Sequence, residues 1–130
     1  MKRIAIVDDS SCARMFIHKC LEIIGLGDAE IIEAVDGKDA LTKIQETPVD
    51  LLITDLSMPI MDGEALLKWV KGSPGLRDVP VLVISSAGNP AREEQLLKLG
   101  ALGVLAKPIS PVTLLRTLEP FLDAEEGKNA

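Results

Sequence analysis

The sequence has few aromatic residues and no excess of positive charge. Its 130 residues include two phenylalanines, one tryptophan and no tyrosine, a composition that disfavours a flavin site built on ring stacking. Acidic residues outnumber basic residues by 20 to 14, which gives a formal net charge of −6. A chain without a broad positive field is not expected to bind nucleic acid directly.

Cysteine, histidine and long apolar runs are also scarce. Cys12 and Cys20 have no histidine or further cysteine at metal-site spacing, so we expect two reduced thiols within a helix. His18, the only histidine, falls outside the apolar face of that helix, and we expect it to be solvated. No apolar run approaches the roughly 20 residues of a membrane span, and the run within "MKRIAIVDD" is too short for a signal peptide. We therefore expect a cytoplasmic protein without membrane insertion.

Short aliphatic segments alternate with amphipathic patterns along the chain. The aliphatic segments predict five strands, within residues 3–8, 29–35, 50–55, 80–85 and 102–107. The three-and-four spacing of apolar residues predicts helices over residues 11–25, 37–47, 63–71, 90–99 and 111–122. Strands that are apolar on both faces and separated by helices indicate an α/β fold with a parallel sheet covered on both sides.

The predicted helices have recognisable ends and apolar faces. The first helix is expected to begin at Ser10 or Ser11 and to end at Gly25, because serine caps a helix and glycine ends one. Its apolar face comprises Ala13, Phe16, Ile17, Cys20, Leu21 and Ile24. The apolar positions of the last two helices are Leu96 and Leu97, then Val112, Leu115, Leu118 and Leu122. Trp69, on the third helix, is expected to be partly exposed.

The predicted strands and helices are expected to form a single domain. No linker rich in glycine, serine or proline, no low-complexity tract and no internal repeat divides the chain. We expect residues 1–123 to form this domain and residues 124–130, "AEEGKNA", to be a frayed C-terminal tail. No second domain is expected to carry an output.

Polar residues stand where the predicted strands end. They are Asp8 and Asp9 after the first strand, Asp55 at the end of the third, Ser85 and Ser86 at the fourth, and Lys107 after the fifth. In a doubly wound sheet, ligands bind outside the carboxyl ends of the strands. We therefore expect three carboxylates, two hydroxyls and one ammonium group to converge at one edge of the sheet.

A cation is expected among the three carboxylates, because neighbouring carboxylates repel one another strongly without one. Oxygen ligands without histidine or cysteine suit Mg²⁺, which keeps several of its own waters. Lys107 would add a point charge that pairs with a carboxylate or with an added phosphoryl group. This arrangement resembles a phosphoryl-transfer site.

Four motifs resemble the receiver domain of bacterial two-component response regulators. They are "VDDS" at 7–10, "TDLSMPIMDG" at 54–63, "VISSA" at 83–87 and "KP" at 107–108. The resemblance covers nearly the whole chain, whose length is similar to that of chemotaxis-type and phosphorelay-type regulators made of a receiver alone. It implies a flavodoxin-like, doubly wound (βα)5 three-layer sandwich, with five parallel strands in the order 2-1-3-4-5.

The resemblance implies a role for each acidic residue. Asp55 would be the phosphoacceptor for a sensor histidine kinase, a phosphotransfer protein or a small acyl phosphate. Asp9, Asp55 and the backbone carbonyl of Ser57 would bind Mg²⁺, and Asp8 would act mainly through a metal-bound water. The metal and Lys107 would offset the repulsion between the carboxylate nucleophile and the phosphoryl oxygens.

The resemblance also implies a switch. Ser85 would bond to the phosphoryl group and draw the following loop inward, and a cis bond between Lys107 and Pro108 would aim the lysine into the site. Receivers usually have an aromatic residue three positions before this lysine, where the present chain has Val104. The output would therefore come from a different repacking of the fourth helix, fifth strand and fifth helix, the expected docking surface for a downstream protein and for a possible homodimer.

A second departure is Ser86, one of the residues that border the phosphoryl group in the family. Ser86 stands where alanine is common, and the next residue, Ala87, is small and apolar. With Ser57, residues at these places influence the attack of water on the phosphoryl group. We expect dephosphorylation to depend on Ser57 and Ala87.

Three alternatives compete with a phosphorylated receiver. A pseudo-receiver would dock proteins constitutively without phosphorylation. A phosphohydrolase with an aspartate nucleophile would need a second aspartate two residues after Asp55, where the chain has Ser57. A flavodoxin-like cofactor binder would have to hold a phosphate with the loop "DDSS", which repels it unless a metal intervenes. The expected domain is no enzyme for other substrates and catalyses only its own phosphorylation and slow dephosphorylation.

Overall fold

The computed structural model describes residues 1–86 and 89–129, with side chains for residues 1–86 and 89–123. The strands are β1 (Arg3–Val7), β2 (Glu30–Ala34), β3 (Leu51–Asp55), β4 (Val81–Ser85) and β5 (Gly103–Ala106). The helices are α1 (Ser11–Leu21), the π-helical turn η1 (Glu22–Leu26), α2 (Gly37–Glu46), α3 (Gly63–Gly72), α4 (Pro90–Lys98) and α5 (Pro111–Asn129). The predicted alternation of strands and helices is confirmed.

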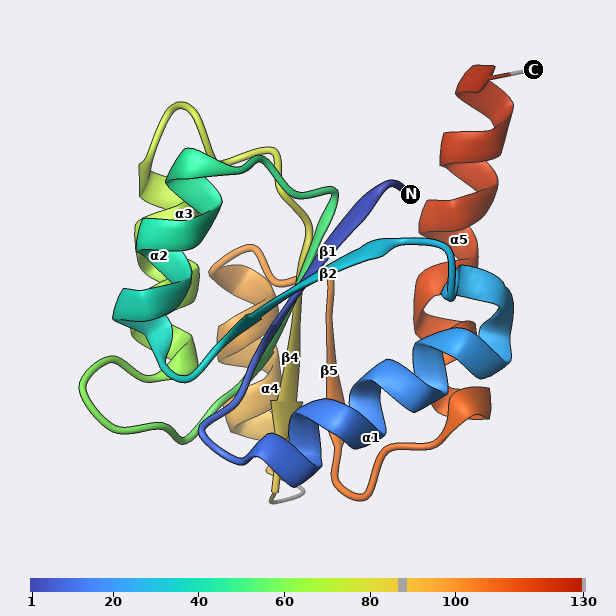
Figure 1. Cartoon of the computed structure of the whole chain (residues 1–130). Helices are drawn as coiled ribbons and strands as arrows, with labels where there is room; N and C mark the ends of the chain where they lie inside the picture. The colour runs from blue at the N-terminus through green and yellow to red at the C-terminus, as the bar shows by residue number, and fades with distance from the viewer. Residues whose placement is uncertain (87–88, 130) are drawn as a thin grey trace.

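All five strands form one parallel sheet in the order β2-β1-β3-β4-β5 (Figure 1). The strand β1 pairs with both β2 and β3, so the strand order reverses at β1. Val7 of β1 lies beside Thr54 of β3, and the next residues, Asp8 and Asp55, therefore leave the sheet at the same edge. The predicted α/β class and strand order are confirmed.

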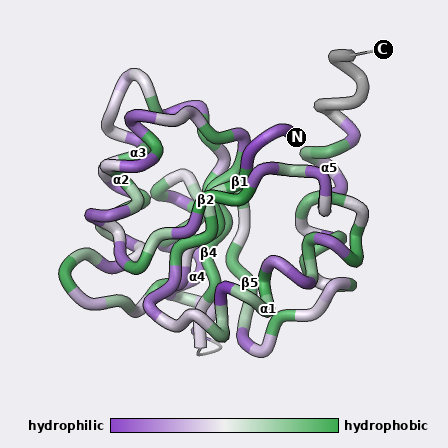
Figure 2. Tube along the Cα trace, viewed as in Figure 1, coloured by the Kyte–Doolittle hydropathy of each residue, from purple (hydrophilic) through white to green (hydrophobic). Residues whose placement is uncertain are grey.

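Two apolar layers lie between the sheet and its helices, with α1 and α5 on one face and α2, α3 and α4 on the other (Figure 1). In Figure 2 the hydrophobic colour gathers on the central strands. Every residue of β3 and β4 is buried, as expected for strands covered on both faces. The rigid centre of the sheet therefore ends directly at Asp55 and Ser85.

Short polar side chains fix the N-terminal ends of four helices. The Ser10 hydroxyl accepts a hydrogen bond from the backbone N–H of Ala13 at the start of α1. Asp36, Asp62 and Asn89 cap α2, α3 and α4 in the same way. Of the two predicted caps for the first helix, Ser10 is the one that the structure uses.

The first and last helices end differently from each other. After Leu21 the chain continues through η1, where Gly25 has a φ of 94°, in the left-handed region that glycine adopts without strain. The helix predicted over residues 11–25 is therefore divided into α1 and η1, and Gly25 is the residue at which the helical backbone conformation breaks. The helix α5 runs to Asn129, beyond residue 122 where we expected it to end. Within the described residues, no helix is long and apolar enough to cross a membrane.

Three residues that we expected on buried helix faces are exposed. Phe16 is 49% exposed, Leu97 48% and Val112 57%, so these three predictions were wrong. A helix that lies on a sheet buries a narrower stripe than the full three-and-four pattern marks, and residues at the border of the stripe stay open. Phe16 borders an apolar hollow that it shares with Pro108 and Ile109, which follow β5.

Candidate functional site

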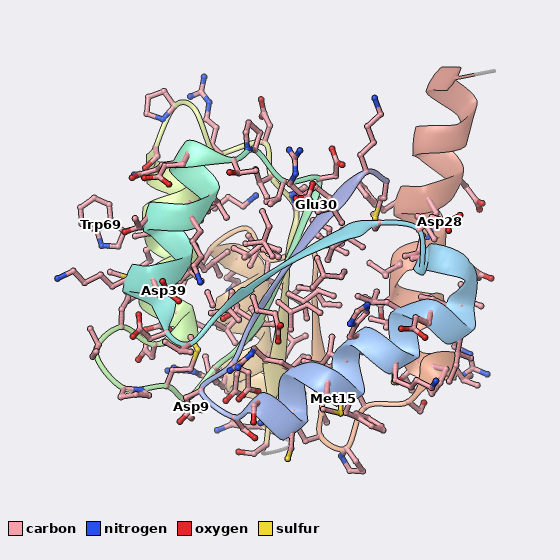
Figure 3. All side chains as sticks on the ribbon, viewed as in Figure 1. Asp9, Met15, Asp28, Glu30, Asp39 and Trp69 are labelled. Carbon is pink, nitrogen blue, oxygen red and sulfur yellow. The ribbon has the colours of Figure 1, made fainter. Side chains whose placement is uncertain are left out.

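Three carboxylates gather at the carboxyl edge of the sheet. Asp8 and Asp9 follow β1, and Asp55 is the last residue of β3; Figure 3 shows Asp9 at this edge. One carboxylate oxygen of each residue lies within 4.8 Å of the others. Asp8 is 2% exposed and Asp55 is 5% exposed, whereas Asp9 is open to solvent. The structure brings these three residues together as their places at strand ends led us to expect.

Burial raises the pKa of the Asp8 carboxyl above its ordinary value, because a charged group loses its hydration inside the protein. The negative charges of Asp55 and Asp9 raise it further. The Ser10 N–H, which donates a 2.9 Å hydrogen bond to Asp8 Oδ1, and the Lys107 ammonium oppose this rise. Burial therefore makes ionisation of Asp8 harder than that of an exposed carboxyl, and a further cation at the site would favour the ionised form.

Lys107 faces the carboxylates from the end of β5. Its Nζ lies 3.0 Å from Asp55 Oδ1 and 3.9 Å from Asp8 Oδ2. Its backbone N–H donates a 2.8 Å hydrogen bond to the Ser85 carbonyl, which continues the pairing of β4 and β5 beyond both strands. The bond between Lys107 and Pro108 is cis, as the resemblance implied.

The donor set fits a hard divalent cation such as Mg²⁺. The carboxylate cluster contains no histidine or cysteine among the residues that the structure describes. Three carboxylates against one ammonium also leave the edge negative, and a bound cation would correct this. Asp8, Asp9 and Asp55 would hold the ion, together with the carbonyl of Ser57, which lies on the exposed loop after β3.

The loop between β3 and α3 is held close to the strand end. Gly63 donates a 2.9 Å hydrogen bond from its N–H to the Leu56 carbonyl. A Cβ atom on Gly63 would overlap the carbonyl oxygen of Asp55 and would lie 2.9 Å from Leu56 Cα. Gly63 therefore allows the backbone of α3 to approach the end of β3 closely. Within the same loop, Ile60 has a φ of 68°, a left-handed value that strains a β-branched residue.

A polar hollow of about 520 Å³ opens between the loop after β3 and the start of α4. It is lined by Leu56, Ser57, Met58, Asp62, Ser85, Ser86, Asn89 and Arg92. Ser85, the last residue of β4, is 6% exposed, whereas Ser86 is open to solvent. Hydroxyl, amide, carboxylate and guanidinium groups therefore surround a space directly beyond the end of β3.

The remaining residues expected to modulate the site lie at its margins or outside the described residues. Val104 is half-buried on β5 and packs against the apolar layer on the side of α2, α3 and α4. Pro108 is exposed and lines the apolar hollow that it shares with Phe16. Ala87 lies outside the described residues.

Two arginines at the site were missed by the sequence analysis. Arg14 donates a 2.7 Å hydrogen bond to the Asp8 carbonyl and pairs with Glu33 of β2, so it holds the loop after β1. Arg92 lines the polar hollow, and its Nη1 lies 3.5 Å from Glu64 Oε1. Arg92 did carry a signal, because it is a cation in the first turn of a helix, where the helix dipole favours anions.

The residues expected to have no role in the site lie apart from it. Cys12 and Cys20 are free thiols, the first exposed and the second buried. His18 lies 3.6 Å from Glu22 Oε1 with its side chain 43% exposed. Trp69 is 58% exposed and points away from α3 in Figure 3. The expected free thiols within α1 and the expected exposure of Trp69 are confirmed.

Comparison with known proteins gives matches over nearly the whole chain. Residues 4–119 match the response regulator receiver domain family. A chemotaxis protein CheY homolog of Campylobacter jejuni is 34% identical over 129 residues, which are 98% of each chain. Chemotaxis protein CheY1 of Helicobacter pylori is 32% identical over 125 residues, which are 95% of this chain and 99% of that one.

Solved structures show the same similarity in three dimensions. Chemotaxis protein CheY4 of Vibrio cholerae gives a TM-score of 0.80 at 33% identity, over 92% of this chain and 98% of that one. A CheY-like receiver domain protein of Methanospirillum hungatei gives a TM-score of 0.79 at 28% identity, over 98% of both chains. Fold, acidic edge and relatives together define a phosphorylatable signalling domain. The chain belongs to the response regulator receiver domain family.

Proposed function

We propose that this chain is a single-domain response regulator, formed by residues 1–123, that accepts a phosphoryl group on Asp55. The donor would be a sensor histidine kinase, a phosphotransfer protein or a small acyl phosphate. The observation that carries the proposal is the position of Asp55, buried at the end of β3, 3.0 Å from Lys107 and clustered with Asp8 and Asp9. Its whole-chain similarity to chemotaxis proteins supports the same role.

In this function the Asp55 carboxylate is the nucleophile. A carboxylate oxygen forms a bond to phosphorus while the bond from phosphorus to the donor atom breaks, and the electron pair of that bond leaves with the donor. Because β1 and β4 flank β3 and every residue of β3 is buried, the nucleophile is held in place before the donor arrives. Mg²⁺, held by Asp8, Asp9, Asp55 and the Ser57 carbonyl, would offset the negative charge of the transferring group.

Lys107 and Ser85 would bind the phosphoryl group after transfer. The lysine ammonium already lies beside Asp55, so it can follow the negative charge from the carboxylate to the new phosphoryl oxygens. The Ser85 side chain borders the polar hollow from the neighbouring strand, where its hydroxyl can donate to a phosphoryl oxygen. A group bound in this way would bias the loop after β4 between two arrangements.

The chemistry of the domain would be limited to its own phosphorylation and slow dephosphorylation. Loss of the group needs water to approach phosphorus, and Ser57, Ser86 and Ala87 are the residues proposed to control this approach. Substitutions at Ser57 and Ala87 should therefore change the decay rate of the phosphorylated protein after the donor is removed. Decay at the native rate in both variants would contradict this role.

The output would be docking of a downstream protein in the cytoplasm, without direct contact with nucleic acid. We assign the docking surface to α4, β5 and α5, where the same surface could pair two copies of the chain. Leu97 of α4 and Val112 of α5 support this assignment, because both are apolar and about half exposed. With Val104 in place of an aromatic residue, the signal would reach this surface through a shift of α4.

Intact-mass measurement after incubation with acetyl phosphate tests the proposal. The native chain should gain one alkali-labile phosphoryl group, and the gain should require Mg²⁺. The Asp55→Asn variant should gain none. The absence of an adduct on the native chain under all conditions would contradict the proposal and leave a constitutive docking module.

A further inference from the structure

Arg92 is a cation at a place where its own helix disfavours one. It is the third residue of α4, and its backbone N–H donates a 3.1 Å hydrogen bond to the side chain of the capping residue Asn89. The positive end of the helix dipole lies here, so a negative side chain would be favoured. The first turns of α2, α3 and α4 each carry an acidic residue, Asp39, Glu64 and Glu93, and that of α2 also carries Lys38. A residue that breaks a local rule is a candidate for a functional role.

The present partner of Arg92 is Glu64, and the pair is loose. Its nitrogen-to-oxygen distance of 3.5 Å exceeds the about 2.7–2.9 Å of a charge-assisted hydrogen bond. Among the described residues, Glu64 Oε1 is buried without a hydrogen-bond partner. Lys68 lies 3.7 Å from the other oxygen of Glu64, so the carboxylate keeps a cation nearby when Arg92 moves.

Arg92 also reaches the space beside the phosphoacceptor. It lines the same hollow of about 520 Å³ as Ser57, two residues after Asp55, and Ser85, the last residue of the neighbouring strand β4. Its side chain is 37% exposed and so is not locked in its present place. A guanidinium group presents a planar fork of N–H donors that matches the oxygens of a phosphoryl group.

We propose that Arg92 is a second cationic ligand of the phosphoryl group. When Asp55 is phosphorylated, Arg92 leaves Glu64 and binds a phosphoryl oxygen across the hollow, opposite Lys107. The added group carries about −1.5 to −2 charges and three acceptor oxygens, which offer a place for a further donor beside Mg²⁺ and Lys107. This inference rests on the proposed function of Asp55. Because Arg92 belongs to α4, its change of partner ties the position of α4 to phosphorylation.

Titration with beryllium fluoride and Mg²⁺, a mimic of the phosphoryl group, measures this contact by the change in NMR signals. Arg92→Ala should bind the mimic about tenfold more weakly, the effect of losing one hydrogen bond between charged groups. Arg92→Lys should recover part of the affinity because it keeps the charge. The matched control is Lys98→Ala, which removes an exposed cation from the same helix and should bind as the native chain does.

Glu64→Gln separates a phosphoryl ligand from a purely structural ion pair. If Arg92 must leave Glu64 to bind the mimic, a weaker resting partner makes binding severalfold tighter. If the pair only fastens α3 to α4, Glu64→Gln and Arg92→Ala should weaken binding together. The Nε–Hε signal of Arg92 should also shift when the native chain binds the mimic. Thermal denaturation of each variant shows whether it is folded.

The outcomes separate this inference from the proposed function. A native chain that neither binds the mimic nor accepts a phosphoryl group would contradict both the proposed function of Asp55 and the role of Arg92. If the native chain binds the mimic and accepts a phosphoryl group, but Arg92→Ala binds the mimic as tightly as Lys98→Ala does, only the role of Arg92 is contradicted. An unshifted Arg92 signal, or weaker binding by Glu64→Gln, would have the same meaning.

Discussion

Ile60 combines an exposed apolar side chain with a left-handed backbone in the loop after β3. It is 80% exposed and has a φ of 68°, a conformation that costs a side-chain-bearing residue about 1–2 kcal/mol. Asparagine tolerates this conformation, so Ile60→Asn should raise the free energy of unfolding by about 1 kcal/mol. Urea denaturation measures the change.

Met15→Asn is the control for this prediction. Met15 is 72% exposed on α1, but it has ordinary helical geometry. Asparagine is a poorer helix former than methionine, so this substitution should lower the free energy of unfolding. A loss of stability in both variants would show that Ile60 is not strained in solution.

Asp8 makes stability depend on pH, because its pKa is raised in the folded chain, mainly by burial. A carboxyl whose pKa is higher in the folded chain holds its proton more tightly there than in the unfolded chain. The free energy of unfolding therefore falls as the pH rises from the pKa of the unfolded chain to that of the folded chain. The loss is complete once the pH lies above the pKa of the folded chain. Without Mg²⁺, Asp8→Asn should therefore melt at a higher temperature than the native chain at neutral pH, and the difference should vanish in acid.

Asp28→Asn is the matched control for Asp8→Asn. Asp28 is exposed and lies far from Asp9 in Figure 3. Its substitution changes the net charge by the same amount but should leave the melting temperature close to that of the native chain. An equal rise in both variants would mean that overall charge, rather than the burial of Asp8, controls the effect.

Individual site residues could be predicted where they stand at the ends of apolar strands, because these ends meet at one edge of the sheet. Asp8, Asp55 and Lys107 were identified because each stands at the end of an apolar strand. Arg92 was missed because it enters the site from the side of a helix, where no strand end marks it. The exposure of Phe16 was also missed, because a helical pattern shows which residues share a face but not how wide a stripe the sheet covers.

At the scale of elements, the contact between β3 and α3 depends on Gly63. A Cβ atom on this residue would overlap the backbone at Asp55 and Leu56, which cannot turn away as a side chain can. Gly63→Ala should therefore lower the free energy of unfolding by about 2 kcal/mol or more and displace the phosphoacceptor. Urea denaturation and the yield of phosphorylated protein with acetyl phosphate measure the two effects.

Gly72→Ala, at the other end of α3, is the control for this prediction. No atom lies within 4 Å of a Cβ built on Gly72, and its φ is not positive. Alanine favours a helix over glycine, so the substitution should be neutral or stabilise the protein by about 0.5–1 kcal/mol. A variant Gly63→Ala as stable as Gly72→Ala would contradict the close packing of β3 and α3.

Strands and helices were predictable in number and order, but less so at their ends. The strands were clear because β3 and β4 are buried on both faces, which requires unbroken apolar runs. The break in the helical backbone at Gly25 could be predicted, because glycine adopts a left-handed conformation without strain. The length of α5 could not be predicted, because no glycine or proline stands directly after residue 122 to end the helix.

At the scale of the molecule, topology creates the site. The strand order reverses at β1, so the loops after β1 and β3 bring their carboxylates together while helices cover both faces of the sheet. The meeting of the carboxylates and the helical cover of the sheet can be predicted from the alternation of strand and helix patterns and from the residues at the strand ends. The proposed switch does not follow, because it would depend on the relative energies of two packings of α4, and a sequence pattern contains no such comparison.

Hydride trapping of the phosphorylated chain tests the central claim most directly. Borohydride reduces an aspartyl phosphate to homoserine, and peptide mass spectrometry then identifies the modified residue. After acetyl phosphate and Mg²⁺, we predict homoserine at position 55 alone, and none without Mg²⁺ or after Asp55→Asn. Homoserine at position 8 or 9, or an unmodified chain, would contradict the account of Asp55 as the phosphoacceptor.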